Sequence, residues 1–161
     1  HQGMTEQGIR QMESGIATWR AIGAQISMPY FLSLLAEAYG KNGNPEKGLR
    51  LLAEALDLTN NTEERWWEAE RYRIEGELIL RAHDGGMETE AESCFRQAIA
   101  VAQKQQAKSL ELRAALSLAR LWNGQGKTAE ARAMLSEVHA WFTEGFATGD
   151  LRDGCRGVQP V

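Results

Sequence analysis

Apolar residues recur along the chain at the spacing of an α-helix. In the series Gly48, Leu52 and Ala55, a small residue is followed by apolar residues four and seven positions later. These positions lie on one face of a helix, so the pattern predicts an amphipathic α-helix. Applied to the whole chain, it predicts helices over residues 5–25, 28–41, 45–59, 62–82, 88–105, 108–123 and 128–143.

The series repeats at a nearly constant interval. Its first residues are Gly8, Gly48, Ala91 and Ala131, at intervals of 40, 43 and 40 residues. A further small residue marks the preceding helix of each complete copy, at Ala36, Gly76 and Ala119. Small residues let paired helices approach closely. We therefore predict an all-α fold, a right-handed α-solenoid of about three helical hairpins in units of 40–43 residues, with a leading helix.

Polar residues and glycines predict where the helices begin and end. Ser27 and Asn44 precede prolines, and we expect their side chains to cap the following helices. Asn61, with Glu64 three residues later, has the spacing of a capping box. Turns between paired helices are predicted at Gly43, Gly85–Gly86 and Gly124–Gly126.

The step from Ala36 to Tyr39, followed by the Gly48, Leu52 and Ala55 series, resembles the tetratricopeptide repeat. That repeat is shorter, with about 34 residues. The chain is also similar to the C-terminal repeats of predicted bacterial ATPases that are often fused to adenylate cyclase domains. This second resemblance extends over about residues 9–151. It is carried by the runs Pro29–Leu32, Leu35–Tyr39, Arg65–Glu70, Cys94–Ala98 and Trp141–Phe146.

Charge and composition narrow the classes of partner. The net charge of -4 gives no basic surface for a nucleic-acid backbone. The two cysteines occupy unrelated contexts, which favours a reducing compartment, and no apolar run reaches the roughly 20 residues of a membrane span. We expect a cytoplasmic helical repeat domain over residues 5–151. Residues 1–4 are set aside as an addition from cloning, and residues 152–161 are expected to be a disordered tail.

Several motifs suggest chemistry but have simpler interpretations. Gly124–Thr128 has the end of a phosphate-binding loop, but Leu121 stands where that loop needs its first glycine, so an interhelical turn is predicted. His83 with Asp84 is interpreted as a polar helix end, and Cys94 as a packed thiol. We therefore expect no catalytic residue, metal or cofactor, and no enzymatic activity.

Trp66 and Trp67 are adjacent within a predicted helix. Because neighbouring positions on a helix point in different directions, both cannot face the core, and we expect one to pack inside and the other to lie at a surface.

The first helix of each hairpin is expected to line a concave partner-binding groove. The groove positions lie six and three residues before the small reference residue, and one and four or five residues after it. They are Tyr30, Ser33, Glu37, Lys41, Glu70, Arg73, Glu77, Arg81, Arg113, Leu116, Arg120 and Asn123. Glutamate marks the first two sets and arginine the third, which predicts a groove graded from acidic to basic.

These features favour a non-catalytic protein-interaction scaffold within a larger bacterial signalling protein. Its partner would be a protein, a peptide or another domain of the parent chain. A small-ligand-sensing repeat domain is the first alternative. Self-association into a homodimer through an apolar solenoid end is the second, with Ile9, Met12, Ile16 and Trp19 as the contacting residues.

Overall fold

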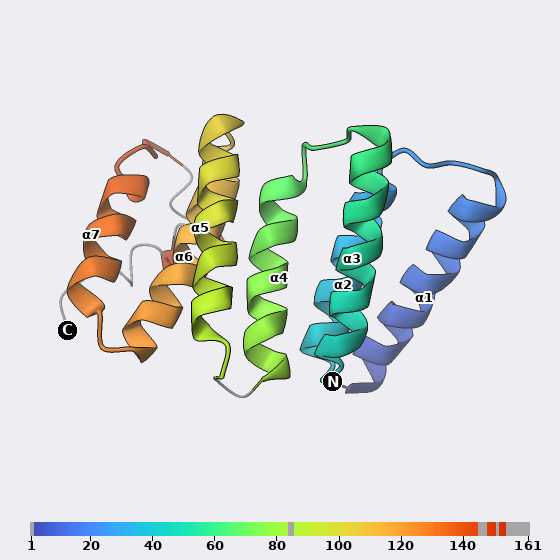
Figure 1. Cartoon of the computed structure of the whole chain (residues 1–161), viewed down its shortest axis with the longest axis horizontal. Coiled ribbons are helices and arrows are strands. Elements are labelled where there is room, and N and C mark those ends of the chain that lie inside the picture. Colours follow the sequence, from blue (N-terminus) through green and yellow to red (C-terminus); the bar gives the residue numbers. More distant parts are fainter. Residues whose placement is uncertain (1, 84–85, 145–147, 151, 154–161) are drawn as a thin grey trace. The chain divides into compact units, whose positions relative to one another are not determined.

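A computed structural model describes residues 2–83, 86–144, 148–150 and 152–153, with side chains from residue 6 onward. In these residues the backbone forms seven α-helices and no β-strand (Figure 1). The helices are α1 (Gln2–Ala21), α2 (Met28–Lys41), α3 (Pro45–Thr62), α4 (Glu68–Ala82), α5 (Glu88–Lys104), α6 (Lys108–Gly124) and α7 (Thr128–His139). The predicted all-α repeat fold is confirmed.

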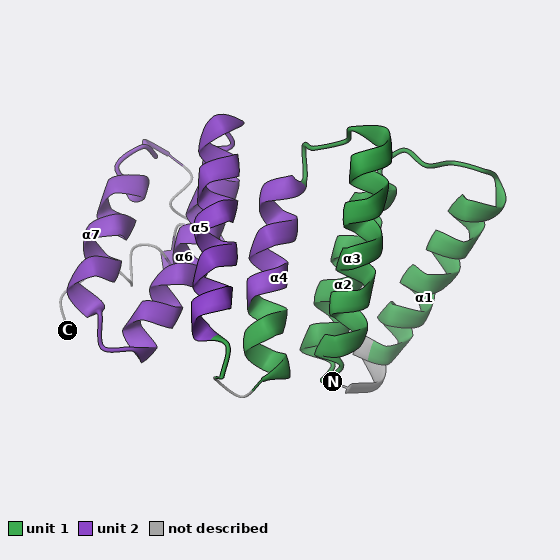
Figure 2. Ribbon diagram, in the orientation of Figure 1, with its two compact units in different colours: residues 1–67, 77–87 green, residues 68–76, 88–161 purple. Residues whose placement is uncertain are grey.

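The chain divides into two compact units (Figure 2). Unit 1 contains residues 1–67 and 77–87, and unit 2 contains residues 68–76 and 88–161. Helix α4 therefore contributes its first nine residues to unit 2 and its remainder to unit 1. The expected extent of the repeat domain, residues 5–151, stays a prediction.

The core of unit 1 is made by apolar residues of its first three helices. These are Ile9 and Ile16 of α1, Met28, Leu32, Leu35 and Tyr39 of α2, and Ala55 of α3. Where α2 meets α3, a methyl group at Gly48 would lie 2.8 Å from the carbonyl oxygen of Ala36. The small residues of the repeat therefore bring the two backbones of this hairpin into contact, as the spacing predicts.

In unit 2 a glycine likewise permits a close contact between helices, here with an aromatic ring. A methyl group at Gly76 would lie 2.6 Å from the ring of Phe95, which is fully buried on α5. Helix α6 packs against both α5 and α7, and its Leu112 and Leu118 are buried together with Leu135 of α7. The predicted small-and-apolar series is thus the face that α3, α5 and α7 bury, from Gly48, Ala91 and Ala131 onward.

The connection between α3 and α4 differs from the prediction. Helix α3 continues to Thr62, and α4 begins at Glu68 instead of residue 62. Glu63 adopts a left-handed backbone with φ of 58°, and its N–H donates to the carbonyl of Thr59, which ends α3. The predicted capping box is wrong. Asn61 lies inside α3, and the carboxylate of Glu64 instead accepts the backbone N–H of Ser27 at 3.0 and 3.1 Å.

The predicted caps at Ser27 and Asn44 are correct in position and wrong in mechanism. Both residues directly precede a helix that has proline in its first turn, but neither side chain caps an amide. Ser27 has a left-handed backbone with φ of 61°, whereas a capping serine needs an extended one. The side-chain amide of Asn44 donates to the backbone carbonyl of Asn42 at 3.3 Å instead.

The glycine-containing turn after α6 matches its prediction. Gly126 has φ of 79°, which glycine adopts without steric cost, and the N–H of Lys127 donates to the carbonyl of Trp122 at 2.9 Å. Residues 125–127 therefore form the interhelical turn, between Gly124 at the end of α6 and Thr128 at the start of α7. Gly43 has the same φ between α2 and α3, whereas Gly85 lies outside the described residues. Helix α1, Gln2–Ala21, begins and ends earlier than the predicted 5–25, and α7 ends at His139 instead of residue 143.

Candidate partner-binding surface

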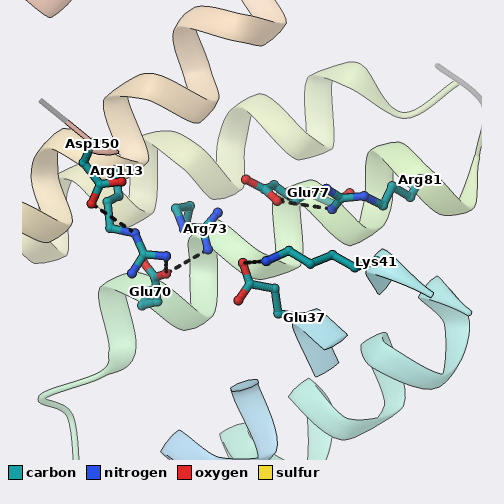
Figure 3. Close-up of polar contacts among 8 residues, drawn as sticks. All are labelled: Glu37, Lys41, Glu70, Arg73, Glu77, Arg81, Arg113 and Asp150. Atoms are coloured by element: carbon teal, nitrogen blue, oxygen red, sulfur yellow. Dashed lines mark hydrogen bonds and ion pairs between the residues drawn. The ribbon is translucent and has the colours of Figure 1, made fainter. Parts of the chain in front are cut away.

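The predicted groove positions on α2 have different degrees of access. Ser33 is buried, and its hydroxyl donates to the carbonyl of Pro29 at 2.7 Å, so it cannot meet a partner. Glu37 is half-buried and lies 3.2 Å from the ammonium of the exposed Lys41 (Figure 3). Tyr30 is half-buried. Helix α2 thus offers a tyrosine and one acid–base pair.

On α4, the two predicted positions that belong to unit 2 are buried. The side chain of Glu70 is only 1% exposed, and its Oε1 lies 2.7 Å from Nη2 of Arg73 and 2.7 Å from Nη2 of Arg113. Arg73 is also buried. One carboxylate thus holds two guanidinium groups from two helices, which makes it a structural element of unit 2 (Figure 3).

The two remaining positions on α4 belong to unit 1 and are more accessible. Glu77 is half-buried and accepts both Nη atoms of the exposed Arg81 at 3.2 Å. This contact repeats the Glu37–Lys41 pair, because in each case the acid precedes the base by four residues.

The positions on α6 include two arginines that contact the C-terminal segment. Arg113 Nε lies 3.9 Å from the carboxylate of Asp150, and Arg120 Nη2 lies 3.2 Å from that of Asp153. Arg113 and Arg120 are seven residues apart, which is about two helical turns, so they share one face. Two acidic residues of unit 2 thus lie along this face.

The other two predicted positions on α6 differ in access. Leu116 is buried and Asn123 is exposed.

The predicted groove therefore needs two corrections. Ser33, Glu70, Arg73 and Leu116 are buried and serve packing, because the simple offsets from the small residue reach the helix flank as well as its open face. The expected gradient from acidic to basic is replaced by local pairing. Glu37, Glu77 and Glu70 each face a base, and the arginines of α6 face acids. A binding role for the accessible positions stays a prediction.

Unit 1 carries an aromatic cluster around Tyr30. Its ring centroid lies 5.4 Å from that of Phe31, 5.2 Å from that of Trp66 and 4.7 Å from that of Trp67. Trp66 is 50% exposed, so one tryptophan lies at the surface as predicted, whereas Trp67 is half-buried and not fully packed inside. The predicted helix around them is wrong, since both precede α4.

The apolar end predicted for self-association is partly covered. Ile9 and Ile16 are buried in the core of unit 1, while Met12 is half-buried and Trp19 is 37% exposed. The sequence interpretation missed two further exposed residues, Ile22 and Ile26. The predicted helix 5–25 includes Ile22, whereas α1 ends at Ala21 and leaves both isoleucines in the connection to α2.

Cys94 and His83 have side chains that could carry chemistry. Cys94 is half-buried, and burial together with the nearby charge of Glu75 raises the pKa of its thiol to about 11. His83 is exposed, and Asp84 lies outside the described residues. The part of the chain that the structure describes contains no cluster of three metal-ligating side chains. None of its helices has the length and apolarity of a membrane span.

Comparison with known proteins agrees with the observed fold. The family model of the tetratricopeptide repeat matches residues 29–63 and 112–137. These segments cover α2 with α3, and most of α6 with α7.

One curated relative and one solved structure are similar over most of this chain. An uncharacterized protein of Rhizobium meliloti (strain 1021), R02095, is 29% identical over 114 residues, which are 71% of this chain and 11% of that protein. The chain thus spans about a tenth of that relative. A Podosopora anserina protein described as a kinesin light chain with nearly identical TPR-like repeats superposes with a TM-score of 0.69 at 19% identity. The match covers 97% of this chain and 76% of that one, and at this identity it shows the fold alone.

Proposed function

Because the chain is a tetratricopeptide-like repeat region, we propose that it is a non-catalytic module that binds polypeptide segments for a larger protein. Repeats of this type generally mediate protein–protein interaction, and their fold is typically non-enzymatic. The larger protein is proposed to be a bacterial signalling protein acting in the cytoplasm. The much greater length of the Rhizobium meliloti relative supports a role as one part of a longer chain.

The observation that carries the proposal is the arrangement of the C-terminal segment on α6. Asp150 and Asp153 place two carboxylates on Arg113 and Arg120. This face thus accommodates a short acidic stretch of polypeptide within its own unit. We propose that a partner uses the same face with carboxylates at similar spacing, and that it competes with residues 148–153.

Electrostatics supports an acidic ligand on α6 and modest affinity. Arg120 is 61% exposed and Arg113 is 31% exposed, so contacts to them are screened by water and salt. An exposed ion pair is worth about 0.2–1 kcal/mol. Each arginine should therefore change affinity by up to about fivefold.

The test uses the chain ending at Glu144, which removes Asp150 and Asp153 from this face of α6. A fluorescent peptide of residues 148–153 is titrated, and binding is followed by anisotropy. We expect saturable binding that weakens as salt is raised, and an affinity that falls by up to about fivefold with Arg120→Gln. The matched control is Arg96→Gln, because Arg96 is an exposed arginine of α5 paired with Glu92.

The outcomes separate recognition from general charge attraction. Equal losses with Arg120→Gln and Arg96→Gln would contradict a defined site on α6, as would unchanged binding of a peptide with both aspartates replaced by asparagine. Circular dichroism of each variant checks that the helices remain folded.

A further inference from the structure

We infer that the apolar groove between α1 and α2 is the seat of another helix, the first helix of a hairpin whose second helix is α1. The occupant is an amphipathic helix of the same polypeptide, preceding α1. The groove belongs to unit 1, and its proposed role does not depend on peptide binding at Arg113 and Arg120 of α6.

The groove is open and apolar. It encloses about 330 Å³. Its walls are Met12, Gly15, Ile16 and Trp19 of α1 and Phe31 and Leu34 of α2. None of these side chains is ionisable, so the surface matches an apolar stripe and offers no partner to a charged group.

The repeat identifies what should cover this surface. Met12, Gly15 and Trp19 are equivalent, at the interval of 40 residues, to residues on α3 that are all buried, namely Leu52, Ala55 and Thr59. The next equivalents, on α5, are also buried: Phe95, Ala98 and Ala102. On α1, by contrast, Gly15 is exposed, Met12 is half-buried and Trp19 is 37% exposed. The positions that are buried on α3 and on α5 are therefore open on α1.

The surroundings of the glycines show the same difference. Gly48 of α3 lies against α2, since a methyl group there would be 2.8 Å from the carbonyl oxygen of Ala36. A methyl group at the equivalent Gly8 would meet no atom within 4 Å, and neither would one at Gly15. Glycine inside a helix costs about 0.5–1 kcal/mol relative to alanine. A close helix neighbour would account for Gly8, and none of the residues that the structure describes lies within 4 Å of a methyl group there.

The chemistry of the occupant follows from α2, which fills the corresponding place on α3. It needs a small residue opposite Gly8, as Ala36 stands opposite Gly48, and larger apolar residues at helical spacing on either side. The turn of residues 42–44 joins α2 to α3, so a turn of the same length would join the occupant to α1.

The experiment restores the missing hairpin from the chain's own repeat. A second copy of residues 28–44 is joined directly to Thr5, because Thr5 is equivalent to Pro45 at the interval of 40 residues. All residues from Thr5 onward are kept. We expect the added helix to slow hydrogen exchange of the amides of residues 12–19 at least about tenfold and to raise the thermal midpoint by about 5 °C or more.

Two matched variants test the seat itself. Gly8→Leu in the extended chain places a bulky side chain where the helices must touch, and Ala36→Leu in the added copy does so from the other side. Both should cancel the gain in exchange protection. A copy with Lys41→Ala, changed at an exposed position, should keep the gain.

The alternative occupants give different results. If the extension leaves exchange of residues 12–19 unchanged, or if the blocked variants protect as well as the unblocked one, the inference is overturned. Sedimentation of the unextended chain measures whether a second copy occupies the groove. A dimer that Gly8→Leu dissociates would assign the groove to a second copy and would also overturn the inference.

Discussion

At the scale of single residues, Gly48 and Gly8 are sequence equivalents with opposite surroundings. Gly48 faces the backbone of α2, and Gly8 faces open space. We predict that Gly48→Ala lowers the free energy of unfolding by about 1–3 kcal/mol through overpacking. Gly8→Ala should raise it by about 0.5–1 kcal/mol, because alanine favours the helix and meets nothing. Urea denaturation of both variants measures this, and changes of the same sign would contradict the packing described for α3.

Cys94 provides a second residue-scale prediction. Its thiol pKa is raised to about 11, so the nucleophilic thiolate is rare at neutral pH. In a Cys155→Ser background, iodoacetamide at pH 8 should modify the native protein much more slowly than the urea-unfolded protein, in which the pKa returns toward 9.0. Mass spectrometry over time measures both rates. Equal rates would show that Cys94 is accessible and ionised in the fold.

Glu13 of α1 joins Tyr39 and Lys47 in a polar contact across three helices of unit 1. The hydroxyl of Tyr39 donates to Glu13, and Lys47 lies 3.1 Å from the same oxygen. These hydrogen bonds from Tyr39 and then Lys47 lower the pKa of Glu13 below 4.5. A carboxyl with a lowered folded-state pKa stabilises the fold above its unfolded pKa, and this contribution is lost as pH falls through the folded value.

Glu13→Gln should therefore lower the urea midpoint slightly at pH 7, and the difference from the parent chain should shrink as pH falls below 4.5. The exposed Glu137 of α7 supplies the control, Glu137→Gln. A difference for Glu13→Gln that stays constant down to pH 3 would show that its charge does not contribute.

At the scale of helices, α4 depends on a buried charge that its sequence alone does not reveal. Glu70 is enclosed and paired with Arg73 of the same helix and Arg113 of α6. Removing one partner of a buried ion pair costs about 3–5 kcal/mol, because the buried charge that remains loses that counterion. We predict that loss for Glu70→Ala, against at most about 1 kcal/mol for Glu77→Ala, whose partner Arg81 has a side chain that is 41% exposed. Guanidinium denaturation compares them, and similar losses would refute a special role for Glu70.

The helices could be predicted from the sequence because each has a long apolar face with a period near 3.6. Helices α2, α5 and α6 have boundaries within one residue of the prediction. The start of α4 could not be read, because residues 60–65 are all polar and carry no periodic signal. There the left-handed Glu63 decides the boundary, and the contact of Glu64 with the distant Ser27 replaces the local cap.

At the scale of the whole molecule, the repeat interval predicts the all-α architecture and the pairing of helices. It does not predict which charges face one another, because pairs such as Arg113 with Glu70 or Arg120 with Asp153 join residues 43 and 33 positions apart. The offsets that define the expected groove follow an ideal helix, whereas access at Ser33 and Leu116 depends on the neighbours that cover them. For the same reason, the division of α4 between two units has no signature in the sequence.

That division has a testable consequence for unit 1. Leu78, in the part of α4 that belongs to unit 1, is fully buried and fills the space above two glycines, Gly40 of α2 and Gly48 of α3. Stacked repeats draw stability from such contacts with the next element. A fragment of residues 1–87 keeps Leu78, whereas a fragment of residues 1–67 loses it.

We predict that fragment 1–87 unfolds cooperatively in urea and that fragment 1–67 has a clearly lower midpoint, both followed by circular dichroism at 222 nm. Leu78→Ala in the longer fragment separates this side chain from the rest of α4. It should cost about 2–5 kcal/mol, because it leaves a cavity against the two glycines, where no side chain can move in to fill it. If the two fragments had equal midpoints, or if Leu78→Ala had no effect, α4 would not stabilise the hairpin of α2 and α3, and unit 1 would end at residue 67.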